Sequence, residues 1–85
     1  MSDKAARIDT ILKVMKNTWD LPADCNEGEL FAYAETLYDR IACGDGKEAL
    51  YAYLEGVQGG NLEMPSSGAA RAIVDRALAL AKDWR

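Results

Sequence analysis

The feature that most constrains the fold is a helix stop followed almost at once by a helix start, within residues 43–48. Cys43-Gly44 is typical of a helix end, because glycine tolerates the left-handed backbone conformation that closes a helix. Asp45-Gly46-Lys47-Glu48 then has the form of a capping box, in which a cap residue is followed at the third helical position by a carboxylate. Two helices are therefore expected to meet at a sharp corner.

A second capping box, Asn26-Glu27-Gly28-Glu29, marks the start of the helix that precedes this corner. Apolar residues then recur at i, i+3, i+4 and i+7 through both helices, which is the period of a half-buried helix. These apolar residues are Leu30, Phe31, Ala34, Leu37, Tyr38 and Ile41 before the corner, and Leu50, Tyr53, Leu54 and Val57 after it.

Two further helices are predicted at the ends of the chain. Ser2-Asp3 can cap the first, and a serine of Pro65-Ser66-Ser67 can cap the last. Their expected buried faces comprise Ala5, Ile8, Ile11, Leu12, Met15 and Trp19, and Ala70, Ile73, Val74, Ala77, Leu78, Ala81 and Trp84. No strand pattern competes, so the sequence predicts one all-α domain over residues 1–85, a small four-helix bundle with helices at about 3–18, 27–43, 46–58 and 67–84.

Three local features refine this prediction. Trp19 is expected to be a core anchor, with an exposed binding tryptophan as the lesser alternative. Gly56 and the pair Gly59-Gly60 are expected to weaken the end of the third helix. Leu62 and Met64 follow in the longest irregular segment, where they either tuck beneath the loop, which we favour, or form an exposed apolar spot.

The charge is distributed unevenly along the chain. The net charge is −4, yet residues 1–16 and 71–85 each carry more basic than acidic side chains. The segment between them holds ten acidic residues and only two basic ones, Arg40 and Lys47. Such a surface repels nucleic acid and attracts basic partners. Acidic residues that merely keep a small protein soluble would give the same composition.

Several classes of chemistry lack their residues. The chain has no histidine, which removes the commonest general base and the commonest metal ligand at neutral pH. Cys25 and Cys43 flank one predicted helix roughly 25 Å apart, too far for a disulfide and too few for a zinc site. We therefore expect reduced thiols, a cytoplasmic location, no metal, no cofactor and no catalytic activity. No apolar run is long enough to span a membrane, and no secretory signal is recognisable.

The acidic residues beside the corner are the candidate binding site. Glu35 and Asp39 stand at i, i+4 on the exposed face of the second helix, a spacing at which like charges destabilise the helix by a few tenths of a kcal/mol. Glu29 lies on the flank of that helix. Tyr51, at the edge of the buried face of the third helix, is flanked by Glu48 and Glu55. A rigid aromatic side chain beside carboxylates suits recognition of a basic protein. The alternatives are a half-buried tyrosine and a solvated acidic face.

The residues from Gly46 to Tyr53, Gly-Lys-Glu-Ala-Leu-Tyr-Ala-Tyr, resemble a motif of a known family. The small immunity proteins that neutralise nuclease colicins and pyocins are acidic, four-helical and of similar length. They carry a glycine turn, an acidic residue, two apolar residues and a tyrosine pair followed by proline. The last helix of these proteins begins with a motif of the type Ser-Pro-x-Gly-Ile-Val. The present chain is similar there, with Pro65-Ser66-Ser67-Gly68 followed shortly by Ile73-Val74.

The resemblance implies contact residues for a toxin. Glu48 and Tyr51 would touch the nuclease, and Leu30, Ala34 and Tyr38 would match positions that set specificity. Ala52 and Tyr53 stand where the family has its second tyrosine and its proline.

Two functions remain open on this basis. The first is an acidic helical protein that binds and inhibits a basic, nucleic-acid-handling protein, as an immunity protein or a phage-encoded inhibitor does, without touching nucleic acid or membrane itself. The alternative is a structural or regulatory module that self-associates as a homo-oligomer. Its contact would be the Leu62/Met64 loop or a smooth ridge formed by the outward-facing Ala72 and Ala79.

Overall fold

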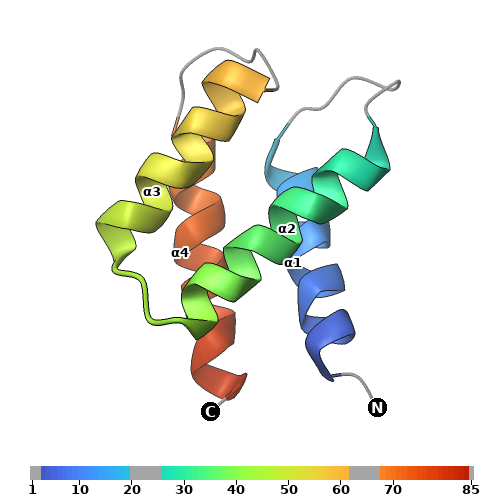
Figure 1. Cartoon of the computed structure of the whole chain (residues 1–85), viewed down its shortest axis with the longest axis vertical. Helices are drawn as coiled ribbons and strands as arrows, with labels where there is room; N and C mark the ends of the chain where they lie inside the picture. Colours follow the sequence, from blue (N-terminus) through green and yellow to red (C-terminus); the bar gives the residue numbers. More distant parts are fainter. Residues whose placement is uncertain (1–2, 20–25, 62–67, 85) are drawn as a thin grey trace.

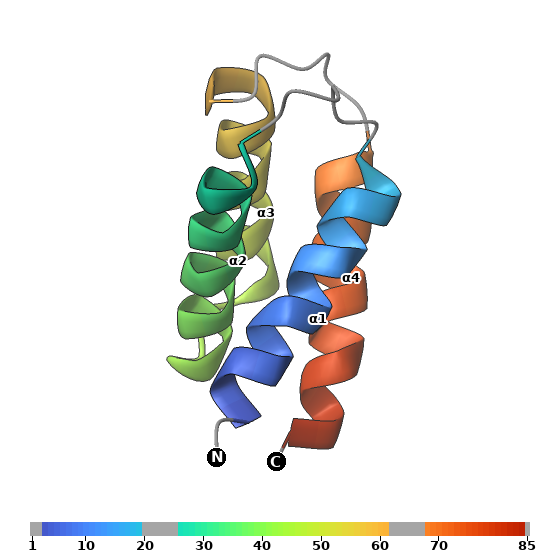
Figure 2. The ribbon, with the colours of Figure 1, turned by 90° about the vertical axis from the view of Figure 1, so that its right-hand side faces the viewer.

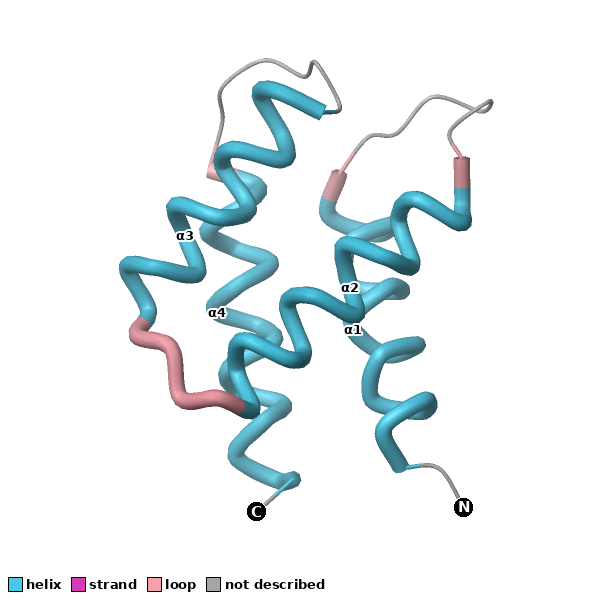
Figure 3. Tube along the Cα trace, in the orientation of Figure 1, coloured by secondary structure: helices cyan, strands magenta, loops and turns pink. Residues whose placement is uncertain are grey.

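The computed structural model describes residues 3–19, 26–61 and 68–84. Within these ranges the chain forms four α-helices and no strand, which confirms the predicted all-α bundle (Figure 3). The helices are α1 (Asp3–Thr18), α2 (Glu27–Ala42), α3 (Lys47–Gly56) and α4 (Ala69–Ala81). A π-helical turn, η1 (Val57–Asn61), continues α3, and a 3-10 turn, η2 (Lys82–Trp84), continues α4.

The helices lie in two layers. Figure 2 shows α2 and α3 in one layer and α1 and α4 in the other. In Figure 1, α2 runs obliquely in front of α1, and α3 lies in front of α4. The main contacts join α1 to α2, α3 to α4 and α1 to α4, whereas α2 and α3 touch only slightly. The shortest dimension of the Cα trace is 16 Å, as two helix layers about 8–10 Å apart require.

The apolar stripes of the four helices meet between the layers. Trp19 is buried with 2% of its surface exposed, as predicted. The buried hydrophobic residues are Ile8, Ile11, Leu12, Met15, Trp19, Leu30, Ala34, Leu37, Ile41, Leu50, Tyr51, Leu54, Val57, Ala70, Ile73, Val74, Ala77 and Ala81. Two residues assigned to the core from periodicity are not in it, because Ala5 and Phe31 are exposed.

The start of α2 and the end of α2 follow the expected capping chemistry. The Asn26 side chain accepts a hydrogen bond from the Glu29 backbone N–H at 3.2 Å. At the other end Gly44 adopts a positive φ of 88°, and its N–H donates to the Ile41 carbonyl at 3.0 Å. The next N–H, of Asp45, donates to the Arg40 carbonyl at 3.0 Å. This pair of bonds closes the helix as a Schellman motif and turns the chain sharply.

The capping box predicted at Asp45 is wrong. Gly46 is the N-cap of α3 and offers no side chain to the first turn. The Asp45 carboxylate instead lies 3.3 Å from Nη1 of Arg40. The Arg40 guanidinium also sits 4.8 Å from the centre of the Tyr53 ring, which links α2 to α3.

Burial raises the pKa of Tyr53, opposed in part by its hydrogen bond with Thr36.

The boundaries of α3 and α4 differ from the prediction. The helical path after α3 continues through Asn61 as the π-turn rather than ending near residue 58. α4 begins at Ala69, and its N-cap is Gly68, which forms no side-chain cap bond. The expected start at residue 67 with its serine cap, and the placement of Leu62 and Met64, lie outside the described residues.

Candidate protein-binding surface

Glu35 and Asp39 lie on the exposed side of α2, as the sequence predicts. Asp39 is 3.5 Å from Nζ of Lys4 on α1, so its charge is partly compensated. Glu35 is exposed, and no cation of the described chain lies within ion-pair distance of it. Glu35 therefore holds an uncompensated charge one turn before a compensated one.

Phe31 joins these carboxylates on the same side of α2. It is 41% exposed, and it is the only large hydrophobic side chain exposed within the described residues. At 3.6 residues per turn it lies about 100° around the helix from Leu30 and only about 40° from Glu35. We call Phe31, Glu35 and Asp39 the α2 edge.

The exposure of Phe31 has a geometric cause. The buried residues of α2 are Leu30, Ala34, Leu37 and Ile41, which span only about 60° of the helix surface. This stripe already fills the contact with the rest of the bundle, and Phe31 falls outside it. The apolar pattern alone could not show that Phe31 is exposed. Both Leu30 and Phe31 have apolar residues three or four and seven positions further along the helix, so the spacing allows either one to be buried.

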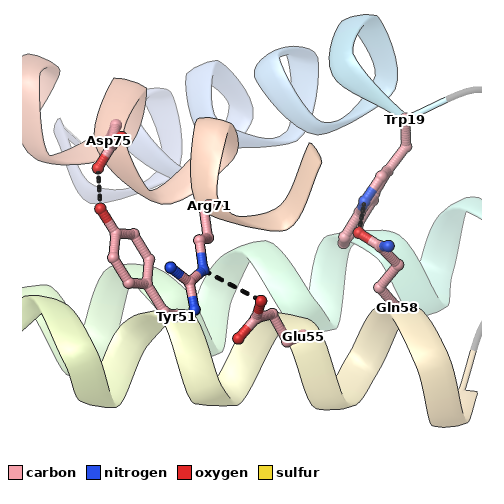
Figure 4. A network of polar contacts seen from close by, with 6 residues as sticks. All are labelled: Trp19, Tyr51, Glu55, Gln58, Arg71 and Asp75. Carbon is pink, nitrogen blue, oxygen red and sulfur yellow. Dashed lines mark hydrogen bonds and ion pairs between the residues drawn. The ribbon is translucent and has the colours of Figure 1, made fainter. Parts of the chain in front are cut away.

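Tyr51 faces α4 rather than solvent. It is 8% exposed, and its hydroxyl donates a 2.5 Å hydrogen bond to Oδ1 of Asp75 (Figure 4). The guanidinium of Arg71 lies 5.1 Å from the centre of its ring, and Nζ of Lys47 lies 5.6 Å from it. Tyr51 therefore packs inside the bundle, and little of its surface is left for a partner to bury.

The surroundings of Tyr51 form a charged network between α3 and α4. Nε of Arg71 donates to Oε2 of Glu55 at 3.1 Å (Figure 4). Nζ of Lys47 lies 3.4 Å from Oδ1 of Asp75. The hydrogen bond from Tyr51, followed by the bond to Lys47, lowers the pKa of Asp75. Hydrogen bonding with Tyr51, and then with Asp75, raises the pKa of Lys47. The network stabilises helix packing and leaves Glu55 with a cationic partner.

The six predicted binding residues therefore do not form one surface. Asp39 is turned toward Lys4 on α1, whereas Glu55 and Tyr51 are turned toward α4. Glu48 is exposed on α3 without an ion pair in the described chain, and Glu29 is exposed in the first turn of α2. Glu29 lies about 120° around α2 from Glu35, so it faces another direction.

A second buried contact, unseen in the sequence, joins α1 to η1. Nε1 of Trp19 donates to Oε1 of Gln58 at 2.9 Å (Figure 4). Gln58 is only 3% exposed and is the one polar residue buried in the described chain. Nothing in the sequence around Gln58, which precedes Gly59 and Gly60, predicts that it is buried and bonded to Trp19. The bond holds the last residue of the α1 segment against the π-turn.

Of the described residues, none form a group of three or more histidine, cysteine or acidic side chains that could hold a metal. Cys43 is an exposed free thiol, and Cys25 lies outside the described ranges. None of the described helices is long and apolar enough to cross a membrane.

Comparison of the chain with protein-family models, with curated proteins and with solved structures finds no match. The resemblance to nuclease immunity proteins therefore stays a hypothesis. Of the positions it assigns to toxin contact, Leu30, Ala34 and Tyr51 are buried in this fold. Tyr38 is half-buried, and Glu48 is exposed.

Proposed function

We propose that this protein binds a basic, nucleic-acid-handling protein through the α2 edge and so blocks it. The observation that carries the proposal is the placement of Phe31, an exposed aromatic side chain, one helical turn from the uncompensated carboxylate of Glu35. An aromatic anchor supplies affinity, and neighbouring carboxylates steer a basic partner toward it.

The size of the anchor can be judged from its exposure. A phenylalanine side chain buries about 150–250 Å² when fully covered, so the 41% that is exposed leaves roughly 60–100 Å² for a partner. At about 25 cal/mol per Å², covering this area stabilises the complex by roughly 1.5–2.5 kcal/mol. Tyr51, at 8% exposure, offers far less. We therefore propose Phe31, rather than the Tyr51 expected from the sequence, as the aromatic anchor of the binding surface.

The carboxylates would act mainly on the association rate. The protein carries a net charge of −4, and a cationic nucleic-acid-binding surface attracts it over about a Debye length, some 8–10 Å. Once bound, Glu35 and Asp39 would occupy cationic side chains that otherwise hold phosphates. Inhibition would follow from this occupation and requires no catalytic group. An immunity-type protein and a phage-type inhibitor share this mechanism.

The test is a pull-down from the native host, followed by binding measurements on the recovered protein. Phe31→Ala is expected to weaken binding by about tenfold or more, in keeping with its roughly 2 kcal/mol. Glu35→Gln is expected to slow association. Glu48→Gln is the matched control, because Glu48 is also exposed and forms no ion pair with another described residue.

The outcomes separate two surfaces. Loss of binding on changing Phe31 or Glu35, with Glu48→Gln unaffected, supports the α2 edge. If Glu48→Gln weakens binding and the α2 variants bind as wild type, the contact is on α3 as in the immunity proteins, and the α2 edge is only a solvated face.

A further inference from the structure

Two adjoining hollows lie between the C-terminal ends of α2 and α4. Their volumes are about 280 and 370 Å³, and both are walled by Ile41, Gly44 and Ala81. The first also has the rings of Tyr38 and Trp84, whose centres are 5.6 Å apart. The two hollows share these walls, and we call them together the α2–α4 groove.

Two cations line this groove without a carboxylate partner among the residues that the structure describes. Arg7 lies 5.3 Å from the centre of the Trp84 ring, and its Nη2 donates to the Trp84 carbonyl at 3.3 Å. Lys82 lines the second hollow. Neither forms an ion pair within the described residues, whereas Asp45, the acidic residue of the same hollow, is paired with Arg40. The groove therefore combines an aromatic and aliphatic wall with uncompensated positive charge.

The same molecule carries the complementary chemistry on the α2 edge. Phe31 exposes part of its ring, and Glu35 has no cationic partner within the described parts of the chain. Phe31 lies about ten residues, or roughly 15 Å, from the end of α2 that borders the groove, so a molecule cannot fill its own groove with this rigid helix. A second molecule can.

We propose that the α2–α4 groove binds the α2 edge of a second copy of this chain. Phe31 enters beside Tyr38 and Trp84, and Glu35 meets the cations of the groove, Arg7 and Lys82. The contact joins two unlike patches, so it either closes reciprocally into a two-fold dimer or continues into an open chain. The contact uses one aromatic side chain and a few charged ones, so we expect the association to be weak and concentration-dependent.

This self-association goes beyond the proposed function and does not rest on it. It covers Phe31 and Glu35, so a basic partner would compete with it for the same edge. The test uses no partner, which keeps the two proposals separately falsifiable.

The experiment is sedimentation velocity over about a hundredfold range of protein concentration, since mass action makes such association visible at the upper end. Wild type is expected to form dimers or larger species. Glu35→Lys and Lys82→Glu are each expected to weaken association at least tenfold when measured alone. An equimolar mixture of the two variants is expected to associate again, because a cationic edge then meets an anionic groove.

Glu48→Lys is the control, because it changes the net charge by the same amount as Glu35→Lys at an exposed site outside the contact. Both changes reduce repulsion between acidic copies, so the control is expected to associate at least as well as wild type. Circular dichroism checks that each variant is folded. A wild type that stays monomeric at every concentration overturns the proposal. So does a mixture that fails to associate, or a control that loses association as Glu35→Lys does.

Discussion

Replacing Trp19 by phenylalanine tests the contact that holds α1 against η1. The change removes the indole N–H that donates to the buried side chain of Gln58, and loss of this hydrogen bond costs about 0.5–1.5 kcal/mol. The smaller ring adds about 1–2 kcal/mol, since complete truncation of a buried tryptophan costs about 3–5 kcal/mol. The expected loss is therefore about 1.5–3.5 kcal/mol.

This loss is large for a chain of 85 residues. At about 0.05–0.15 kcal/mol per residue, the free energy of unfolding is roughly 4–13 kcal/mol. A domain of this size loses about 4–8 °C in Tm for each kcal/mol, so the Trp19→Phe variant is expected to melt at least about 6 °C lower than wild type. Urea unfolding followed by circular dichroism gives the free energy directly.

A double-mutant cycle with Gln58→Met isolates the hydrogen bond from the loss of ring volume. Methionine keeps the length of the side chain and removes the acceptor. The expected coupling energy between the two positions is about 0.5–1.5 kcal/mol. A coupling below about 0.3 kcal/mol would mean that the bond adds nothing. A Trp19→Phe cost below about 1 kcal/mol would show that the indole is not buried as described.

Two further predictions concern the network between α3 and α4. Tyr51→Phe is expected to lower the free energy of unfolding by about 1 kcal/mol, because the lost bond goes to a carboxylate that is half exposed, and to leave partner binding unchanged. Urea unfolding checks that the Tyr51→Phe variant is folded. If the folded variant binds the partner more weakly than wild type, Tyr51 contributes to the binding surface. The lowered pKa of Asp75 stabilises the fold above the ordinary aspartate value of about 4, and this contribution is lost as pH falls through the lower folded value. The free energy of unfolding of Asp75→Asn should therefore depend less on pH at acid pH than that of wild type. If the two proteins lose stability equally as the pH falls, Asp75 does not make this contribution.

The helices and most of the core were predictable because they depend on local spacing. Asn26 and Gly44 act through bonds to residues within a few positions, so capping chemistry located both ends of α2. Trp19 extends the apolar stripe of α1 and is buried accordingly. Asp45 shows the limit of the same reasoning. Its carboxylate had two acceptable partners, and the folded chain pairs it with Arg40 rather than with the first turn of α3.

The candidate site was not predictable in the same way, because it depends on how the helices pack. Phe31 and Leu30 are adjacent in the sequence, and only the packing of the bundle decides which of them is covered. Tyr51 is buried, and its hydroxyl donates to Asp75, which lies 24 positions away in the chain. Packing also turns Asp39 toward α1 and Glu55 toward α4, which divides the expected acidic cluster.

The most direct measurement of the proposed function is the association rate of the protein with its captured basic partner as a function of ionic strength. The Glu35→Gln/Asp39→Asn variant is compared with wild type by stopped flow. We expect the variant to associate more slowly and to show a flatter salt dependence, with a nearly unchanged dissociation rate, because the removed charges act through steering. Association rates that match wild type at every salt concentration would contradict the claim that the α2 edge recognises a basic protein.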